Sequence, residues 1–407
     1  GGRSERTSVQ CRAMNPIVVH KYGGSSLSDL DKIRRVAKRI VDTVQEGKRV
    51  VAVVSAMGGT TDALIEKAKG VSDTPNAREL DMLLSVGERI STALLAIAVH
   101  DLGVPAVSFT GSQSGIITNT RHNRARIIEV RPYRLMDELD AEKVVIVAGY
   151  QGVSYSREIT TLGRGGTDTT AVALAAALDA EYCEICSDVD GVYTADPRIV
   201  PSAQRLDELS HDEMVALARS GARVLNQDCV AYASQSGVAL FAKATFGPRD
   251  DKGSVVRLNP KSGHRPITAI AHRDQIARVV ASPAVTLERL LEVSGALSAL
   301  PCSISGGGPG RETEMHIALE DVHHRDTLFE RLHEGFGDAV KADLDHGSVS
   351  VVGQGLGDTP QLLRSILATA KQIVGHDLAL RLDPLTATLT LPCAAVKDTV
   401  RALHEAL

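Results

Sequence analysis

Short runs of consecutive apolar residues alternate with longer amphipathic stretches through the first 260 residues of the chain. Residues 16–22 (PIVVHKY) and 49–55 (RVVAVVS) have the length and the β-branched content of strands. Between them, residues 28–46 carry apolar side chains at helical spacing, and Gly47 ends that helix. Because the strand runs are continuously apolar, both faces of the sheet are expected to be covered by helices. The pattern predicts an α/β sandwich with a largely parallel central sheet.

Further elements follow the same pattern. Strands are expected at residues 104–109, 143–148, 181–186 and 238–245, and helices at 63–69, 80–99 and 167–178.

The character of the sequence changes near Pro260, where residues 261–266 (KSGHRP) are typical of a linker. Beyond it, two segments of similar length each combine strands and helices, which predicts a pair of ferredoxin-like α+β modules. The expected strands are 277–281, 314–319, 348–352, 378–382 and 387–391, and the expected helices are 285–300, 325–334, 360–374 and 394–406. A chain of 407 residues exceeds one compact core. We therefore expect a larger domain at 16–260 and a region suited to regulation or assembly at 267–407.

Composition and charge exclude several classes of protein. Lys and Arg number 45 and Asp and Glu 50, and the chain has no Trp, 7 Tyr and 5 Phe, so a basic or aromatic nucleic-acid surface is not expected. No uninterrupted apolar run approaches the roughly 18 residues of a membrane span, and residues 1–15 lack the apolar stretch of a secretory signal. Six scattered cysteines are typical of reduced thiols. These features predict a cytoplasmic enzyme.

A glycine-containing turn follows the first predicted strand. In Lys21-Tyr22-Gly23-Gly24-Ser25-Ser26, the glycines let backbone N–H groups approach an anion, while Lys21 and the next helix N-terminus add positive charge. The alternative is a strand-to-helix turn that binds nothing. The turn is not a Walker A loop, because Gly-Lys-Ser/Thr does not follow the glycines.

Two more loops occupy equivalent positions, at residues 55–62 (SAMGGTTD) and 161–168 (TLGRGGTD). Ligands of open α/β sheets gather outside the carboxyl ends of the strands, so the three loops are expected to converge. Arg164 is suited to clamp a carboxylate, and Asp168 to accept an ammonium. Helix capping is the alternative for Asp168, but it does not explain an arginine among three glycines. Glu88, in residues 85–91 (SVGERIS), is a further candidate, although a helical Glu is more often simply solvated.

Residues 187–198 (SDVDGVYTADPR) follow another predicted strand. Their polar groups and aromatic ring are suited to hold an adenine and a ribose. A calcium loop or a plain turn is the alternative, but the spaced ligands and closing Glu of an EF-hand are missing.

Taken together, these segments resemble the aspartate kinases (aspartokinases) of the amino acid kinase family. The matching strings, in the family's order from residue 17 to about 202, are KYGGSS, VVSAMGGTTD, SVGERIS, GYQG, TTLGRGGTDTTAVALAAAL and CEICSDVDGVYTADPRIVP. The C-terminal modules lie where such enzymes carry tandem ACT domains. The resemblance implies ATP-dependent phosphorylation of the side-chain carboxylate of L-aspartate to give 4-phospho-L-aspartate. It also implies homo-oligomers formed through the ACT-like modules.

The resemblance also implies roles for individual residues. Catalytic roles fall on Lys21, Arg164 and Asp168, with Lys21 following the γ-phosphate. Substrate binding falls on Ser55, Thr61, Glu88, Arg164 and Asp168, and ATP binding on Lys21, Gly23, Gly24, Ser25, Ser187, Asp188, Tyr193, Asp196, Arg198 and Arg223. A carboxylate needs no deprotonating base, so positioning and electrostatics are expected to supply the rate. Mg²⁺ is expected to arrive on the nucleotide, without a dedicated protein site.

Three positions depart from the family pattern. Arg223 replaces a lysine, which changes a compact ammonium to a planar fork. Asp62 replaces an asparagine and adds negative charge near an anionic substrate. Residues 281–286 (ASPAVT) lack the glycine of the usual effector loop, which makes the ACT modules degenerate and predicts weak or absent inhibition by lysine or threonine. Two alternatives remain: a kinase that acts on a modified aspartate, and a non-catalytic effector-binding subunit on the same scaffold.

Overall fold

The computed structural model describes residues 15–163, 165–261, 263, 265–296, 301–306, 310–319, 322, 325–376, 378 and 380–407. The chain divides into two compact units. The first contains Gly1–Asp190 and Ala231–Arg257, and the second contains Gly191–Val230 and Leu258–Leu407. The domain boundaries expected from the sequence stay a prediction.

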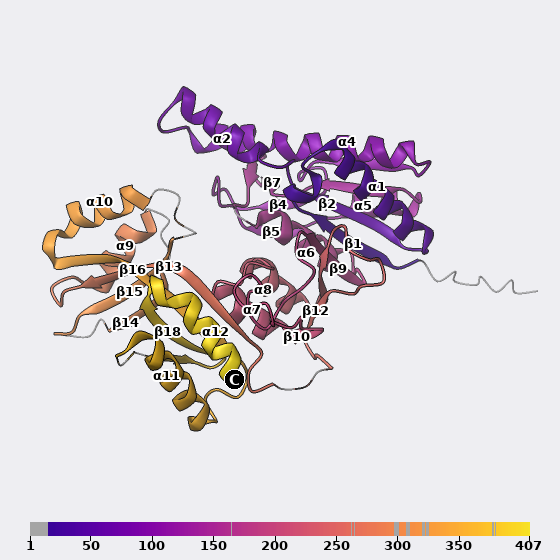
Figure 1. The fold of residues 1–407 in the computed structure, drawn as a ribbon. Coiled ribbons are helices and arrows are strands. Elements are labelled where there is room, and N and C mark those ends of the chain that lie inside the picture. Colours follow the sequence, from indigo (N-terminus) through magenta and orange to yellow (C-terminus); the bar gives the residue numbers. More distant parts are fainter. Residues whose placement is uncertain are drawn as a thin grey trace, which may run out of the picture. The chain divides into compact units, whose positions relative to one another are not determined.

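The first unit is built on a largely parallel sheet with the strand order β12-β11-β9-β1-β2-β6-β3 (Figure 1). Its strands are β1 (Ile17–Tyr22), β2 (Arg49–Val54), β3 (Ala106–Phe109), β6 (Val144–Ala148), β9 (Tyr182–Ser187), β11 (Leu240–Ala244) and β12 (Ser254–Arg257). Only the pairing of β12 with β11 is antiparallel among these strands. The side chains of β2 from Val50 to Val54 are fully buried, as their unbroken apolar run predicts.

Helices cover both faces of this sheet. On one face, α1 (Leu30–Gln45) begins at Asp29, whose side chain caps the N–H of Lys32, and packs with α4 (Val86–Asp101) around a common apolar core. On the other face lies α6 (Gly166–Ala177), whose alanine-rich middle is buried on all sides. The remaining elements are η1 (Gly24–Leu27), α2 (Thr60–Val71), α3 (Ala77–Leu84), α5 (Tyr133–Asp140), and a four-stranded sheet in the order β5-β4-β7-β8, formed by β4 (Ile116–Thr118), β5 (Ile127–Val130), β7 (Gln151–Ser154) and β8 (Ile159–Thr161).

The helical stretch Ala77–Asp101 differs from its prediction in two ways. It divides into α3 and α4 at Ser85 instead of forming one helix. Among the described residues it is also a helix long and apolar enough, by length and composition, to cross a membrane. The sequence criterion missed it because polar residues interrupt the apolar run. Half of its most apolar 18-residue window is buried inside the protein, which is typical of a core helix.

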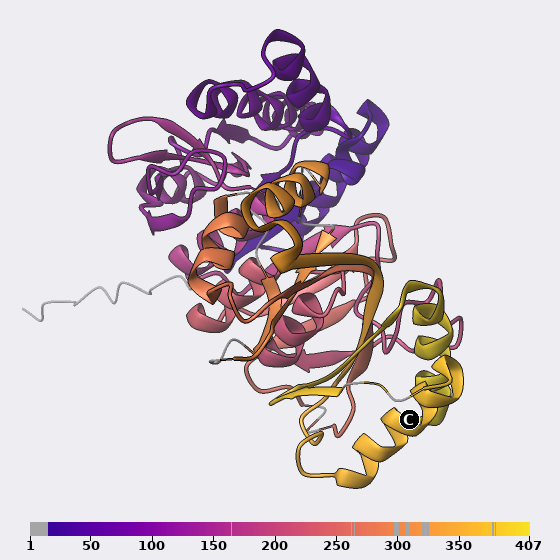
Figure 2. The ribbon, with the colours of Figure 1, turned by 90° about the vertical axis from the view of Figure 1, so that its left-hand side faces the viewer.

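The second unit contains a six-stranded antiparallel sheet with the order β14-β15-β13-β16-β18-β17. Its strands are β13 (Ala269–Ala281), β14 (Pro301–Gly306), β15 (Thr313–Ala318), β16 (Val340–Val352), β17 (Leu380–Asp383) and β18 (Thr386–Pro392). The long strands β13 and β16 pair with each other, so the two predicted modules share one continuous sheet. The helices α9 (Leu287–Ala296) and α10 (Arg325–Phe336) lie at one end of these strands, and α11 (Pro360–Val374) and α12 (Val396–Ala406) at the other (Figure 2).

The second unit also takes in a segment from the middle of the sequence. This segment contains β10 (Glu208–Ser210) and α7 (His211–Arg219), and the boundary with the first unit falls inside α8 (Gln227–Ser236). Ile199 and Val200 belong to the same apolar core as β16, β18, α11 and α12. The Ile270 N–H donates to the Thr194 carbonyl at 2.8 Å, and the Thr194 hydroxyl bonds His404 Nε2 at 2.9 Å. Residues 191–230 are therefore held by the C-terminal sheet and its helices.

Candidate active site

Lys21 and Asp168, two predicted catalytic residues, form an ion pair. Lys21 lies near the carboxyl end of β1 and Asp168 in the first turn of α6, and their Nζ and Oδ1 atoms are 2.6 Å apart. Both side chains are largely buried, with 12% and 13% exposed. Burial and an anionic partner fix the ammonium beside the glycine turn. From the sequence we expected Asp168 to bind the ammonium group of the substrate. In the structure its carboxylate pairs with the ammonium group of Lys21.

The first and second predicted loops touch through their backbones. The Gly58 N–H donates to the Gly24 carbonyl at 3.0 Å. A Cβ atom at position 24 would lie 2.9 Å from the Ala56 carbonyl oxygen, and one at position 23 would lie 3.3 Å from Lys21 Nζ. Glycine at these positions therefore allows a close approach that another residue would prevent. Ser25 is exposed, and its carbonyl accepts a bond from Lys32 Nζ.

Glu88 lies beneath the second loop and is 3% exposed. Its Oε1 accepts the Ala56 N–H at 3.1 Å, while Oε2 has no hydrogen-bond partner among the described residues. Burial raises the pKa of Glu88 to about 7, although the Ala56 N–H bond opposes this. Gly87 allows this depth, because a Cβ there would lie 2.8 Å from the Ala56 side chain. A solvated surface glutamate is thus the wrong interpretation of Glu88, whose Oε2 atom is buried without a hydrogen-bond partner among the described residues.

The second loop also contacts the loop before α6. Ser55 follows β2, and its hydroxyl donates to the Thr167 hydroxyl at 3.0 Å. Thr61 lies in the first turn of α2 and is half-buried. The second loop therefore contacts both helices that carry predicted site residues, α4 through the Ala56–Glu88 bond and α6 through the Ser55–Thr167 bond.

The glycine-rich loop before α6 uses left-handed backbone. Gly163 and Gly165 have φ angles of 83° and 71°, which residues with a side chain rarely adopt. Gly166 approaches Tyr150 and Leu162 so closely that a Cβ would lie 2.7 Å from the Leu162 side chain. Arg164, predicted to clamp a carboxylate, lies outside the described residues.

Asp81 on α3 organises this loop from beneath, and sequence reasoning missed it. The carboxylate is fully buried and accepts bonds from the Thr161 hydroxyl at 2.5 Å, His122 Nδ1 at 2.6 Å and the Asn123 N–H at 3.1 Å. Thr161 ends β8 directly before the glycine-rich loop. The available signal was a carboxylate on the apolar face of a helix, which is costly unless it accepts several hydrogen bonds. Asp81 thus ties the helix that leads to Glu88 to the loop that carries Arg164.

A hydroxyl bridge joins the glycine turn to the strand end at Ser187. The single hydroxyl proton of Thr245 is donated to the Ser187 carbonyl at 3.0 Å, so the Ser26 hydroxyl is the donor in its 2.6 Å bond to Thr245. The Thr245 N–H donates to the same carbonyl at 2.8 Å. Ser26 and Ser187 are therefore held in register by one residue of the segment that follows β11.

A buried ionic cluster supports this bridge. Glu184 accepts bonds from Arg39 at 3.0 Å and Lys243 at 3.1 Å, and Arg39 also donates to the Thr245 carbonyl. Burial alone would raise the pKa of Glu184, but His20, Lys243 and Arg39 together lower it to about 2. Burial lowers the pKa of His20 to about 4, so at neutral pH Arg39 and Lys243 hold Glu184 ionised.

The residues predicted to bind the nucleotide divide between the units. Ser187 ends β9 and the exposed Asp188 follows it, both in the first unit. Tyr193, Asp196, Arg198 and the exposed Arg223 belong to the second. Arg198 donates to Asp196 at 2.7 Å, and these hydrogen bonds lower the pKa of Asp196. The Asp196 carboxylate is therefore ionised and oriented, while the Arg198 side chain remains 84% exposed.

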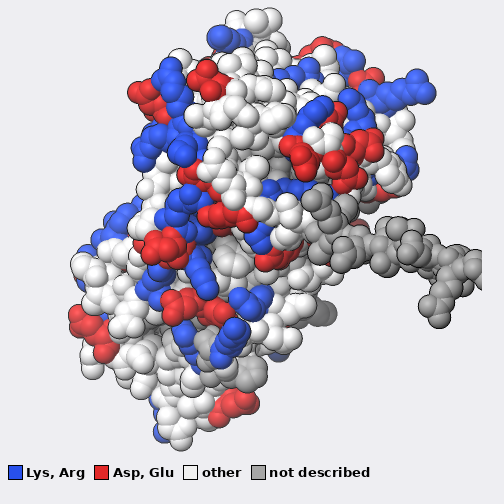
Figure 3. Space-filling view, turned by 90° about the vertical axis from the view of Figure 1, so that its right-hand side faces the viewer, with Lys and Arg blue, Asp and Glu red and all other residues white. Residues whose placement is uncertain are grey.

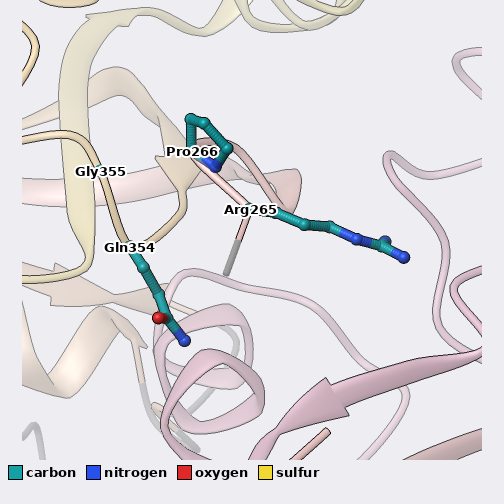
Figure 4. Close-up of a pocket in the computed structure, with 4 residues that line it drawn as sticks. All are labelled: Arg265, Pro266, Gln354 and Gly355. Carbon is teal, nitrogen blue, oxygen red and sulfur yellow. The ribbon is translucent and has the colours of Figure 1, made fainter. Parts of the chain in front are cut away.

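The rest of the described surface has a shallow depression, and its charges are not concentrated on the face shown in Figure 3. A depression of about 320 Å³ is lined by Arg265, Pro266, Gln354 and Gly355, and its Arg265 guanidinium extends away from Gln354 (Figure 4). Gly355 lies in the turn between β16 and α11. No group of three or more His, Cys, Asp or Glu side chains suited to a metal occurs in the part of the chain that the structure describes. Acidic and basic side chains intermingle on the face shown in Figure 3, without a continuous basic field.

Comparison with known proteins identifies the family. The profile of the "Amino acid kinase family" matches residues 16–241. An aspartokinase from Mycolicibacterium smegmatis is 40% identical and covers 96% of both chains. One from Thermus thermophilus is 36% identical over 96% of this chain and 98% of its own. Escherichia coli aspartokinase III, solved in complex with aspartate and ADP, shares the fold with a TM-score of 0.80 at 24% identity, over 96% of this chain and 99% of that chain. The chain therefore belongs to the amino acid kinase family and, within it, to the aspartokinases.

Proposed function

We propose that the protein transfers the γ-phosphoryl group of ATP to the side-chain carboxylate of L-aspartate, which gives 4-phospho-L-aspartate and ADP. The observation that carries this proposal is the buried Lys21–Asp168 pair beside two interlocked glycine turns, with Glu88 beneath them. The relatives named aspartokinase and the E. coli complex with aspartate and ADP support the same reaction.

The chemistry requires positioning more than activation. A carboxylate oxygen of aspartate attacks the γ-phosphorus, the bond to the β,γ-bridging oxygen breaks, and ADP leaves with that electron pair. No proton is transferred in this step, because the nucleophile is already ionised at neutral pH. Lys21 stabilises the negative charge on the transferring group, and Asp168 holds its ammonium in place. Gly23, Gly24 and Ser25 let the turn approach the phosphates.

Recognition of an amino acid requires both of its backbone charges to be matched. Glu88 receives the substrate ammonium. Its carboxyl is buried, its pKa of about 7 lies close to neutral pH, and one of its oxygens has no partner among the described residues. Arg164 binds the α-carboxylate. Ser55 and Thr61 border the same place from the second loop. Because the Asp168 carboxylate already pairs with Lys21, Glu88 is favoured over Asp168 as the partner of the substrate ammonium.

The nucleotide is assigned to the remaining predicted residues. Ser187 ends β9 and Asp188 follows it. The other residues that match the family's nucleotide-binding motif lie in the second unit: Tyr193, Asp196, Arg198 and Arg223. Mg²⁺ enters on the phosphates of ATP and neutralises part of their charge. Its protein ligands would be few, because the nearby carboxylate of Asp168 is engaged by Lys21.

Two finer assignments follow from the same proposal. The protein works in the cytoplasm, where its thiols stay reduced; Cys183, Cys186, Cys229, Cys302 and Cys393 form no disulfide in the described part of the chain. It forms homo-oligomers through the ACT-like modules, whose sheet ends in the edge strands β14 and β17.

A second acceptor is favoured by one residue. Asp62, exposed in the first turn of α2, adds negative charge where relatives of this type carry an amide, and this suits an aspartate derivative with an altered charge. A non-catalytic effector-binding subunit is disfavoured, because such a subunit has no need to bury the Lys21–Asp168 pair.

Trapping of the acyl phosphate tests the proposal. Purified protein with ATP, Mg²⁺ and hydroxylamine is expected to give aspartyl hydroxamate with L-aspartate and less with hydroxylated or N-substituted aspartates. Lys21→Met is expected to lower kcat by at least about 100-fold, since a buried charge that stabilises the transition state is worth roughly 3 kcal/mol. The control is Lys38→Met, whose lysine is 61% exposed on α1. Absence of hydroxamate from every acceptor, or full activity of Lys21→Met, would contradict the proposal.

A further inference from the structure

Three of the residues assigned to the nucleotide lie on one loop of the second unit. Tyr193, Asp196 and Arg198 fall within residues 192–206, which we call the nucleotide loop. An isolated antiparallel bridge at Tyr193 closes the base of this loop. The Ile199 N–H donates to the Asp196 carbonyl at 2.9 Å, so a tight turn begins at Asp196. The position of the Asp196 carboxylate therefore depends on what holds the chain on either side of this turn.

Thr194 is the fixed point before the turn, with one residue between it and Asp196. Its N–H donates to the Gln204 carbonyl at 2.9 Å, and its carbonyl accepts the Ile270 N–H of β13 at 2.8 Å. Its hydroxyl oxygen accepts the Gln204 N–H at 3.0 Å and bonds Nε2 of His404, on α12, at 2.9 Å. Of these partners, only His404 acts through its side chain. The last helix of the chain therefore bonds a residue 210 positions away, directly beside the predicted nucleotide contacts.

The same helix holds the chain after the turn. Arg401 lies one helical turn before His404 on α12 (Figure 1), which places the two side chains on the same side of the helix. Its Nε donates to the Ile199 carbonyl at 3.2 Å, and its Nη1 donates to Asp398 at 2.5 Å, which orients the guanidinium. The helix thus contacts the nucleotide loop on both sides of Asp196.

We propose that His404 and Arg401 are positioning residues for ATP. They hold the nucleotide loop in the shape that presents Asp196 and Arg198 to the nucleotide, and they touch no substrate themselves. The inference rests on the proposed function, which assigns the loop residues to ATP. It makes the final helix of the C-terminal modules a support of the nucleotide site.

A purely structural attachment of the loop is the competing explanation. The attachment of α12 to the second unit comes mainly from its apolar face, where Val396, Val400 and Leu403 are fully buried in the core. The two polar contacts reach the loop instead, and Arg401 is 49% exposed. Loops open at a lower free energy than the core that carries them, so loss of these contacts should loosen the loop before it unfolds the protein. A positioning role therefore affects ATP binding, whereas a structural role affects stability alone.

Steady-state kinetics of the full-length chain separate the two roles. His404→Ala is expected to raise KM for ATP at least about three-fold, because one hydrogen bond is worth roughly a factor of 2 to 13 in an equilibrium constant. The KM for aspartate should change less than about two-fold. His404→Gln should restore most of the ATP affinity, because its amide reaches about as far as Nε2 of histidine. The matched control is Glu405→Ala, the exposed next residue of α12, which should leave both constants unchanged.

Two kinetic results would overturn the positioning role. One is an ATP KM for His404→Ala equal to that of Glu405→Ala. The other is a rise of the aspartate KM as large as the rise for ATP. Circular dichroism should show that each variant is folded. Arg401→Met removes only a partly exposed group and is expected to raise KM for ATP in the same way, so the test also stands if His404→Ala folds poorly.

A double-mutant cycle tests whether His404 acts through Thr194. Thr194→Val keeps the shape of the side chain and removes its hydroxyl. If the two residues act through one bond, Thr194→Val/His404→Ala should raise KM for ATP no further than the more severe single variant. Single effects that multiply in the double variant would show that His404 acts independently of Thr194 and would refute this part of the inference.

Binding of ADP, measured by isothermal titration, separates the inference from the proposed reaction because it needs no turnover. His404→Ala and Arg401→Met should bind ADP at least about three-fold more weakly than Glu405→Ala. Equal binding by all variants and the wild type would overturn the positioning role and leave the proposed function intact. Weaker binding by the two variants, with no aspartyl hydroxamate from the wild type, would support the positioning role and refute the proposed reaction. A wild type that bound no ADP would overturn both.

Discussion

Glu88 provides a sharp electrostatic test of the site. Burial raises its pKa from 4.5 to about 7 in the folded protein. A carboxyl whose folded pKa lies above its unfolded pKa contributes stability that is fully present below about pH 4.5 and is lost as the pH rises through about 7. At about 1.4 kcal/mol per pKa unit, the loss is about 3 kcal/mol. Glu88→Gln removes this dependence, because a neutral amide has nothing to ionise.

The two plots of unfolding free energy against pH, for the wild type and for Glu88→Gln, are expected to diverge as the pH rises. Near pH 5 the unfolding free energies of wild type and Glu88→Gln should agree closely, and at pH 8 the variant should be more stable by about 3 kcal/mol. Urea denaturation at both pH values measures the difference. Glu66→Gln is the control, because Glu66 is 72% exposed on α2 and should give parallel profiles. Parallel profiles for Glu88→Gln would refute the buried-carboxyl reasoning.

Substrate binding adds a second readout. An ammonium beside Glu88 stabilises its ionised form and lowers its pKa, so binding at pH 7 should release about half a proton per site. Isothermal titration of aspartate in phosphate and in Tris buffers measures this release as a difference in binding enthalpy. The wild type should show the release and Glu88→Gln should not. Equal release by both would leave the stability result intact but exclude Glu88 as the ammonium partner.

The other predictions concern the loops and the C-terminal modules. Gly24→Ala should lower kcat at least about ten-fold in steady-state assays, because its Cβ would meet a backbone carbonyl at 2.9 Å; unchanged kinetics would show that the turn yields freely. Asp81→Ala should cost on the order of 3–6 kcal/mol in urea denaturation and Asp81→Asn about 1–3, because the first leaves three donors unpaired; equal costs would contradict the hydrogen-bond account. Thr245→Val should raise KM for ATP several-fold with little effect on KM for aspartate, and Thr245→Ser should restore it; a change in the aspartate KM alone would argue against the bridge to Ser187. Lysine and threonine at millimolar concentration should inhibit less than two-fold, given residues 281–286, and strong inhibition by either would show a working effector loop.

Local patterns were enough to predict much of the fold and part of the site. Continuous valine and isoleucine runs identified β1 and β2, because strands buried on both faces need apolar residues at every position. We expected Lys21 and Asp168 to lie close together because a glycine-containing loop follows a strand in both places. The two side chains do pair, but only Lys21 lies on a strand of the parallel sheet, because the loop of Asp168 follows β8, which pairs antiparallel with β7.

Other features depend on contacts that no local pattern reveals. Asp81 bonds residues 41 and 80 positions away, and only the folded chain shows that its carboxylate is satisfied. The sequence predicted only the second half of β13, because the polar residues His272 to Gln275 interrupt its apolar pattern. In the structure the strand continues through them and bulges there as it pairs with β16. The strand β14 (Pro301–Gly306) was missed because its serine-rich sequence resembles a loop and its stability comes from pairing with β15.

The interleaved course of the chain limits how this enzyme can be divided or recombined. A fragment cut at residue 260 would keep Ile199 and Val200 but lose the strands and helices that enclose them, and Thr194 would lose its bonds to Ile270 and His404. Such a fragment should expose apolar side chains and aggregate even with the glycine turn at residues 21–26 intact. A chimera that takes its C-terminal part from a relative would fold only if residues 191–230 came from the same relative. The part that must be exchanged as a whole is therefore made of two separate segments of the sequence.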